Sequence, residues 1–191
     1  MKRFIAALPL LIAGIAHADA VEWKFDPSHT NVGFSVPHLV ISSVEGRFRE
    51  ASAKVALDDG DLAKSQVSVE INAASIDTGD AKRDDHLKGP DFFDVKKFPK
   101  ITFKSTKITK AGGGYKLTGD LTIRDKTKPV TLDATLSAPV KTPWGNQARA
   151  AKVNGKIKRA DFGLTWNKAL ETGGVVVGDE VTINVSAEVT K

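Results

Sequence analysis

The feature of this sequence that most limits its possible folds is a regular alternation of apolar and polar side chains. In residues 66–71, for example, Val67, Val69 and Ile71 alternate with three polar residues. A period of two residues is typical of β-strands that bury one face and expose the other. The predicted strands cover residues 21–26, 31–36, 46–57, 66–71, 101–108, 115–123, 130–138, 148–158 and 181–190. The sequence therefore predicts an all-β fold with eight or nine strands.

Short turns separate the predicted strands. Typical turn residues stand at 58–60, 112–114, 143–146 and 173–174. Short turns make neighbouring strands antiparallel, and strands with one apolar face form either a sandwich or a closed barrel. Several predicted strands reach ten to twelve residues, which favours a barrel. We expect an eight-stranded antiparallel barrel, whose interior is either filled by side chains or holds one small ligand.

One segment, residues 80–88, has the character of a helix. Asp80 can cap its first turn, and Gly89 can end it. We therefore expect one short helix in a loop of the barrel.

The first twenty residues have the three zones of a secretory signal peptide. A positive start at residues 2–3 is followed by an apolar run over 4–15 and then by small residues. The apolar run is too short to span a bilayer as a helix, which takes about 20 residues. We expect cleavage before Asp19 or Val21, a mature domain over residues 21–191, and export to the periplasm of a bacterium.

The composition narrows the function further. The chain has no cysteine, which excludes disulfides, a thiol nucleophile and a lipid-bearing cysteine at the cleavage site. Its net charge of +5 is spread along the chain, a pattern that favours solubility over nucleic-acid binding. We expect neither a nucleic-acid partner nor a stable membrane anchor.

Few residues suggest catalysis or metal binding. Three histidines follow the predicted signal peptide, His29, His38 and His86, but they lack the short spacings of zinc sites. No nucleophile-elbow motif supports a triad of Ser, His and Asp. We therefore expect no metal, no cofactor and no catalytic residue.

Polar and aromatic residues concentrate in and after the predicted helix. Leu87, Phe92 and Phe93 are candidates for the mouth of a cavity. Arg83 and His86 could donate hydrogen bonds to the polar or anionic head group of a ligand. The alternative is a surface helix with salt bridges, whose aromatic side chains close one end of the barrel.

A second concentration contains Arg159, Asp161 and Trp166. These residues either contact a ligand or include an Arg–Asp ion pair that closes the end of a strand. The sequence leaves both interpretations open.

A series of segments in the chain has the order and spacing of a known family: Trp23, HTNVGFSVPHLVISSVEGRF at 29–48, SIDT at 75–78, RDDHL at 83–87, DFFD at 91–94, FPKITF at 98–103, GDLTI at 119–123, Trp144-Gly145 and RADFGL at 159–164. Through these segments the chain resembles, from Trp23 to Val185, the YceI-like family of periplasmic, lipocalin-like proteins. In one departure, Ala151 and Lys152 stand where the family often has a Gly-Phe pair.

The resemblance implies a lipocalin-like barrel whose pore takes a polyisoprenoid, such as that of a quinone or prenyl diphosphate, or another long-chain amphiphilic lipid. It implies no catalysis. With Phe34 and Phe93 added from the residues themselves, the predicted ligand-binding residues are His29, Asn31, Phe34, His38, Arg83, Asp84, His86, Phe92, Phe93, Arg159, Asp161 and Trp166. We expect a periplasmic binding or carrier protein, with a homodimer as one state to be tested.

Two other functions stay open on the sequence alone. An enzyme acting on such a lipid would use His86 or His29 as acid and base. A filled barrel, plugged by Trp23, Phe34 and Phe103, would serve instead as a structural or partner-binding module.

Overall fold

The computed structural model describes residues 20–171 and 173–191. Except for Ala20, the predicted signal peptide therefore lies outside the described residues. Within the described part of the chain, no helix has both the length and the hydrophobicity that crossing a membrane requires.

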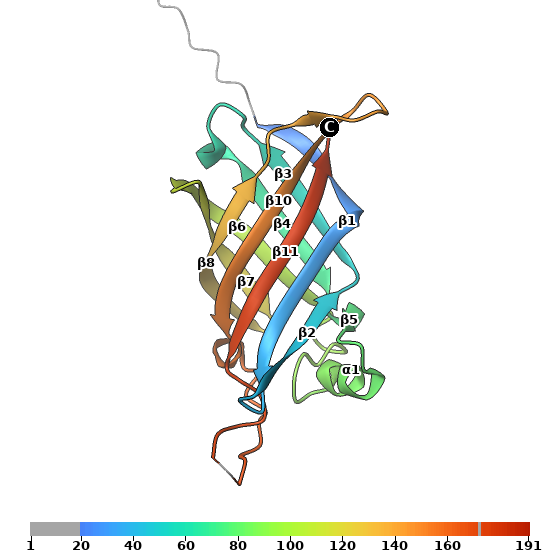
Figure 1. Cartoon of the computed structure of the whole chain (residues 1–191), viewed down its shortest axis with the longest axis vertical. Helices are drawn as coiled ribbons and strands as arrows, with labels where there is room; N and C mark the ends of the chain where they lie inside the picture. The colour runs from blue at the N-terminus through green and yellow to red at the C-terminus, as the bar shows by residue number, and fades with distance from the viewer. Residues whose placement is uncertain (1–19, 172) are drawn as a thin grey trace, which may run out of the picture.

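Eight long strands form a closed antiparallel barrel (Figure 1). They are β1 (Val21–His38), β3 (Ala51–Leu57), β4 (Gln66–Asn72), β6 (Lys100–Ala111), β7 (Gly114–Ile123), β8 (Lys126–Leu136), β10 (Gln147–Lys158) and β11 (Glu180–Thr190). Each is hydrogen-bonded to the next in this order, and β11 pairs with β1 to close the wall. The predicted all-β, eight-stranded antiparallel, lipocalin-like barrel with one short helix in a loop is confirmed.

Shorter elements complete the two ends of the barrel. β2 (Ser42–Phe48) pairs with the second half of β1 and precedes β3, so that β2 and β3 act as one interrupted strand. The other short elements are β5 (Ile76–Asp77), β9 (Val140–Lys141) and the 3-10 helices η1 (Leu62–Lys64), η2 (Ala73–Ser75) and η3 (Arg159–Phe162).

β1 is one continuous strand where the sequence predicts two. Its pairing with β11 changes register between Asp26, opposite Glu188, and Asn31, opposite Ser186. Five steps along β1 thus correspond to two steps along β11, and the three extra residues form a bulge. Joining the two predicted segments reduces nine predicted strands to eight.

The predicted helix is α1 (Ala81–Lys88). Asp80 caps it, because its side chain accepts a hydrogen bond from the backbone N–H of Arg83 at 2.9 Å, and Gly89 follows its last turn. α1 lies outside the barrel beside β5, at the end opposite the C-terminus (Figure 1). We call this end the α1 end and the other the C-terminal end.

Buried apolar side chains gather in two clusters, one toward each end of the barrel. Trp23, Leu57 and Val189 pack near the C-terminal end. The cluster toward the α1 end consists of Ala73, Phe92, Ile101, Phe103, Leu117, Leu121, Ile123, Phe162 and Leu164. Between the clusters, the inward-facing side chains of Val32 and Val185 are only partly buried, although the wall is closed. Because protein cores are normally close-packed, this residual exposure indicates a hollow interior.

Candidate functional site

The barrel contains a lumen of about 340 Å³, a volume within the range of small-molecule sites. Inward-facing side chains of all eight wall strands line it. Among the described residues that line the lumen, polar side chains come only from Thr30, Ser65, Tyr115, Thr135 and Arg159. The lumen is therefore suited to an apolar chain that carries few polar groups.

Two glycines make room for aromatic side chains in the wall. A Cβ atom at Gly46 would overlap the ring of Phe34, and one at Gly119 would overlap the ring of Phe103. Both aromatic residues line the lumen, whereas the filled-barrel alternative requires them to plug it. Trp23, the third residue of that alternative, is buried in the cluster at the C-terminal end.

Phe92 and Phe93 connect the lumen to the segment that follows α1, and both line the lumen. Phe93 packs edge-on against Phe48, with ring centroids 5.7 Å apart. Phe92 contacts Trp166 at 5.3 Å and His86 at 5.0 Å between centroids, and these two rings also meet edge-on. His86 and Trp166 therefore form a second layer behind Phe92, outside the lumen wall.

The polar residues of α1 are engaged by neighbouring residues. Asp84 Oδ1 accepts hydrogen bonds from the backbone N–H and the hydroxyl of Thr78, and Arg83 donates to the hydroxyl and the carbonyl of Thr78. His86 Nε2 lies 2.9 Å from Asp91 Oδ2. These bonds tie the helix to its flanking loops, and contacts of the three residues with a ligand head group stay a prediction.

Arg159 lines the lumen, but its guanidinium group is occupied by the backbone. It donates hydrogen bonds to the carbonyls of Leu164, Trp166, Val177 and Gly178. Burial lowers the pKa of Arg159, an effect that the charge of Asp179 opposes. Asp161 lies exposed on η3. Arg159 therefore closes the end of β10 through carbonyls and not through the ion pair with Asp161 that we considered.

Besides the polar residues of α1, Asp161 and Trp166, three further predicted residues are not among the described residues that line the lumen. The side chain of His29 is 66% exposed and its Nδ1 lies 2.9 Å from Asp26 Oδ2, on the outside of the barrel. Asn31 lines a groove on the outer surface. His38 ends β1, where it pairs with Val177. Direct contact of these residues with a ligand stays a prediction.

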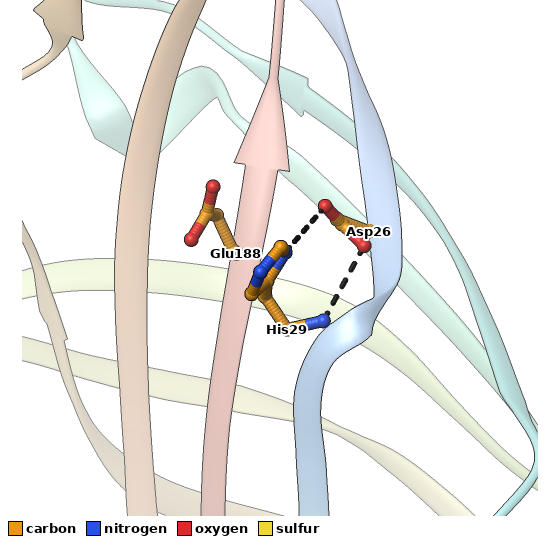
Figure 2. Close-up of side chains that lie close together, drawn as sticks. All are labelled: Asp26, His29 and Glu188. Atoms are coloured by element: carbon orange, nitrogen blue, oxygen red, sulfur yellow. Dashed lines mark hydrogen bonds and ion pairs between the residues drawn. The ribbon is translucent and has the colours of Figure 1, made fainter. Parts of the chain in front are cut away.

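The bulge in β1 carries a cluster of polar side chains on its outer face (Figure 2). Asp26, His29 and Glu188 place three potential metal-ligand atoms within 4.8 Å of one another, the one such group in the described part of the chain. The Asp26 carboxylate already accepts hydrogen bonds from the ring and backbone of His29 and from the hydroxyl and backbone of Ser28. These four bonds account for the shape of the bulge.

The same bonds shift two pKa values. The ring of His29 and then the hydroxyl of Ser28 hold the pKa of Asp26 well below its usual value. The pKa of His29 is raised, by its bond to Asp26, by the charge of Asp26 and by Glu188.

Ser28, His29 and Asp26 have the composition of a catalytic triad but not its geometry. Ser28 Oγ lies 3.3 Å from Nδ1 of His29, and Asp26 Oδ2 lies 2.9 Å from that same nitrogen. A triad histidine uses one nitrogen for the carboxylate and the other for the nucleophile. Moreover, the Ser28 hydroxyl donates to Asp26 at 2.6 Å. The arrangement does not prepare Ser28 for nucleophilic attack.

Most residues of the lumen wall were not singled out from the sequence. Val153 and Val185, for example, line the lumen, whereas the predicted residues came mainly from polar motifs. The usable signal was the alternation itself, because the apolar face of every strand in a closed barrel must point inward. Of the predicted ligand-binding residues, Phe34, Phe92, Phe93 and Arg159 lie on the lumen wall, and so does Leu87, which was predicted at the mouth of a cavity.

Comparisons with known proteins agree with this architecture. A family model, the YceI-like domain, matches residues 23–189. A UPF0312 protein of Serratia proteamaculans is 41% identical over 162 residues, which cover 84% of this chain and 83% of the relative. The crystal structure of BcnA from Burkholderia cenocepacia is 30% identical and has a TM-score of 0.76, with 86% of this chain and 99% of that chain covered.

Two further structures share the fold. The YCEI protein of Campylobacter jejuni is 36% identical, with a TM-score of 0.70 and with 87% of this chain and 95% of that chain covered. A polyisoprenoid binding domain from Saccharophagus degradans has a TM-score of 0.59, with 88% and 98% covered, at 13% identity, which shows the fold alone. Since the family model spans nearly all of the barrel and relatives are similar over most of their length, the chain belongs to the YceI-like family.

Proposed function

We propose that this protein binds a long-chain lipophilic molecule, such as a polyisoprenoid or a similar amphiphilic lipid, in the lumen of its barrel and carries it through the periplasm. The observation that carries the proposal is the lumen itself, about 340 Å³ with an almost wholly apolar wall. A closed wall removes an apolar chain from water on all sides. Of the predicted residues, Phe34, Phe92, Phe93 and Arg159 line the lumen, and we expect them to contact the ligand.

The hydrophobic effect supplies enough free energy for such binding. Each methylene group that leaves water contributes about 0.8 kcal/mol. Ten such groups would therefore contribute about 8 kcal/mol, from which the loss of translational and rotational freedom is subtracted. The lumen thus favours long apolar chains over small polar molecules.

The relatives support this class of ligand. The Saccharophagus degradans domain with the same fold is described as polyisoprenoid binding. The names of the relatives described above include no enzymatic activity. In addition, His29 and His86, the candidates for acid and base catalysis, are not among the described residues that line the lumen. These observations favour binding without catalysis.

Native mass spectrometry of protein purified from a bacterial periplasm, followed by organic extraction, tests the proposal. We expect a discrete lipophilic adduct, or uptake of one when the protein is incubated with quinones, prenyl phosphates or long-chain amides. A mass that corresponds to protein alone after all of these incubations would contradict lipid binding. Conversion of an added lipid to a product in a single-turnover assay would instead support the enzyme alternative.

A pair of variants on β11 shows whether the lumen is the site. Val185 lines the lumen and the next residue, Ser186, is exposed on the outer face. Val185→Trp should fill the lumen and reduce ligand binding at least tenfold, whereas Ser186→Trp adds the same side chain outside and should bind as the wild type does. Equal binding by the two variants would place the ligand elsewhere.

The periplasmic location rests on the predicted signal peptide. N-terminal sequencing of the protein from the periplasmic fraction should give a mature chain that begins at Asp19 or Val21. Recovery of the protein only from the cytoplasm, with residues 1–20 intact, would contradict export.

A further inference from the structure

The turn between β1 and β2 presents large aliphatic side chains to solvent. Val40 is 75% exposed and Ile41 is 83% exposed, and nearby Val175 is 41% exposed. The half-buried Leu39 connects the turn to the segment of Val175, because its backbone N–H donates to the carbonyl of Val176 at 2.9 Å. We call Leu39, Val40, Ile41 and Val175 the apolar tip. Figure 1 shows that this turn and the segment between η3 and β11 extend beyond the barrel at the α1 end.

The backbone of the apolar tip is strained. Leu39 has φ of 53° and Val40 has φ of 65°, in the left-handed region that residues other than glycine rarely adopt, least of all a β-branched residue such as Val40. Hairpin turns of this kind normally contain Asn and Gly. The side chain of Val40 is mostly exposed, so burial within this chain does not offset the strain. Such strain is found mainly where a residue has a functional role.

The apolar tip continues the wall of the lumen. Val36 and Val177 line the lumen. The backbone of His38 pairs with that of Val177, so that the two segments run side by side from the lumen toward the tip. Val40 follows Val36 on the same segment of chain, and Val175 precedes Val177 on the other. Apolar side chains thus lead from the interior of the barrel out to the turn between β1 and β2 at the α1 end.

We propose that the apolar tip inserts into the surface of a lipid bilayer, from which the lumen is loaded or into which it is emptied. This inference rests on the proposed lipid-binding function. A stable protein partner requires roughly 1,200 Å² or more of buried surface, far more than four side chains at a protruding turn provide. A protruding aliphatic turn does suit the boundary between head groups and acyl chains, where apolar side chains leave water while the rest of the domain stays hydrated.

Flotation with vesicles of phosphatidylethanolamine and phosphatidylglycerol tests this docking. The variant V40N/I41S removes the two most exposed aliphatic side chains of the tip, and Asn tolerates the left-handed backbone of residue 40. Trp144→Ser is the matched control, because Trp144 is 87% exposed in the turn between β9 and β10, and this turn lies at the C-terminal end (Figure 1). We expect V40N/I41S to lower the vesicle-bound fraction roughly tenfold, with an unfolding temperature equal to or above that of the wild type, and Trp144→Ser to float as the wild type does.

Several outcomes would overturn the inference. It fails if V40N/I41S floats like the wild type, if Trp144→Ser alone abolishes flotation, or if the wild type does not float with protein-free vesicles. Loading with ligand added from ethanol separates this failure from failure of the proposed function. If V40N/I41S binds ligand from ethanol but is loaded tenfold more slowly from vesicles, docking is supported; if the wild type binds no lipid from either source, the proposed function itself fails.

Discussion

Asp84 holds Thr78 through a single carboxylate oxygen, which accepts one hydrogen bond from the Thr78 backbone N–H at 2.9 Å and another from its hydroxyl at 2.6 Å. Arg83 also donates hydrogen bonds to Thr78, at 2.7 Å to its hydroxyl and at 2.8 Å to its carbonyl. Asp84 and Arg83 thereby fix α1 to the loop after β5. They also set the position of the segment that carries Phe92 and Phe93.

Asp84→Ala should destabilise the fold. Asp84 is 9% exposed, and its removal leaves two donors of Thr78 without their partner, which costs about 1–3 kcal/mol. Asp85→Ala is the control, since the Asp85 side chain is 82% exposed and its removal should change the free energy of unfolding by less than about 0.5 kcal/mol. Urea unfolding measures both, and equal losses would show that the bonds to Thr78 contribute little.

Arg159→Lys should destabilise the α1 end, although the substitution keeps the positive charge at this position. A lysine ammonium group cannot reach the four carbonyls that the planar guanidinium serves. We expect a loss of about 2–3 kcal/mol and faster hydrogen exchange between residues 164 and 178. Lys158→Arg, at an exposed neighbouring position, provides the control. Hydrogen exchange at the wild-type rate in Arg159→Lys would show that one hydrogen bond to a carbonyl is enough to stabilise this segment.

The pair of Asp26 and His29 should respond to pH. The folded pKa of Asp26 lies below its usual 3.8, so the stability it contributes is present above pH 3.8 and is lost as the pH falls through the folded pKa. The folded pKa of His29 lies above its usual 6.5, so its contribution is complete below pH 6.5 and is lost as the pH rises through the folded pKa. The pair therefore stabilises the bulge most between about pH 4 and 6.5.

An NMR titration of the His29 ring checks this pair. Asp26→Asn should move the pKa of His29 down toward 6.5, and Glu188→Gln should move it less, because Asp26 is the larger cause of the shift. A larger effect from Glu188→Gln would reverse the assignment. The hydrogen bond drawn between the Asp26 carboxylate and the His29 ring in Figure 2 would then not describe the protein in solution.

Gly119→Ala should be strongly destabilising, because the new methyl group would overlap the ring of Phe103 and the carbonyl of Lys104. Overpacking of this kind costs about 1–3 kcal/mol. Gly113→Ala has open space around the added atom and should be nearly neutral. Thermal unfolding compares the two variants, and a neutral Gly119→Ala would show that Phe103 can turn into the lumen.

The strands and the closure of the barrel could be predicted because the alternation of apolar and polar side chains applies to every strand. In β4, for example, Val67, Val69 and Ile71 line the lumen as the alternation requires. The continuity of β1 could not be predicted in the same way, because three extra residues reset the alternation at the bulge. Asp26 and Ser28 are typical turn residues, and such residues do not distinguish a turn from a bulge.

The site was predicted less completely than the fold. Polar residues of a family motif can be retained because they hold the backbone, and Arg159 and Asp84 both do so here. Sequence alone does not separate this role from contact with a ligand. Phe92 and Phe93 were identified because they belong to the concentration of polar and aromatic residues in and after the predicted helix. The hollow between the two end clusters depends on strand number and tilt, which single residues do not reveal.

The two separate end clusters have a consequence for the empty protein. With lipid bound as proposed, the cargo acts as the middle portion of a hydrophobic core that the chain itself does not supply. A ligand at one hundred times its dissociation constant would add about 2.7 kcal/mol to the free energy of unfolding. An unloaded barrel is then the form that opens first and is degraded first, so that the supply of lipid would also set how long each copy of the carrier survives.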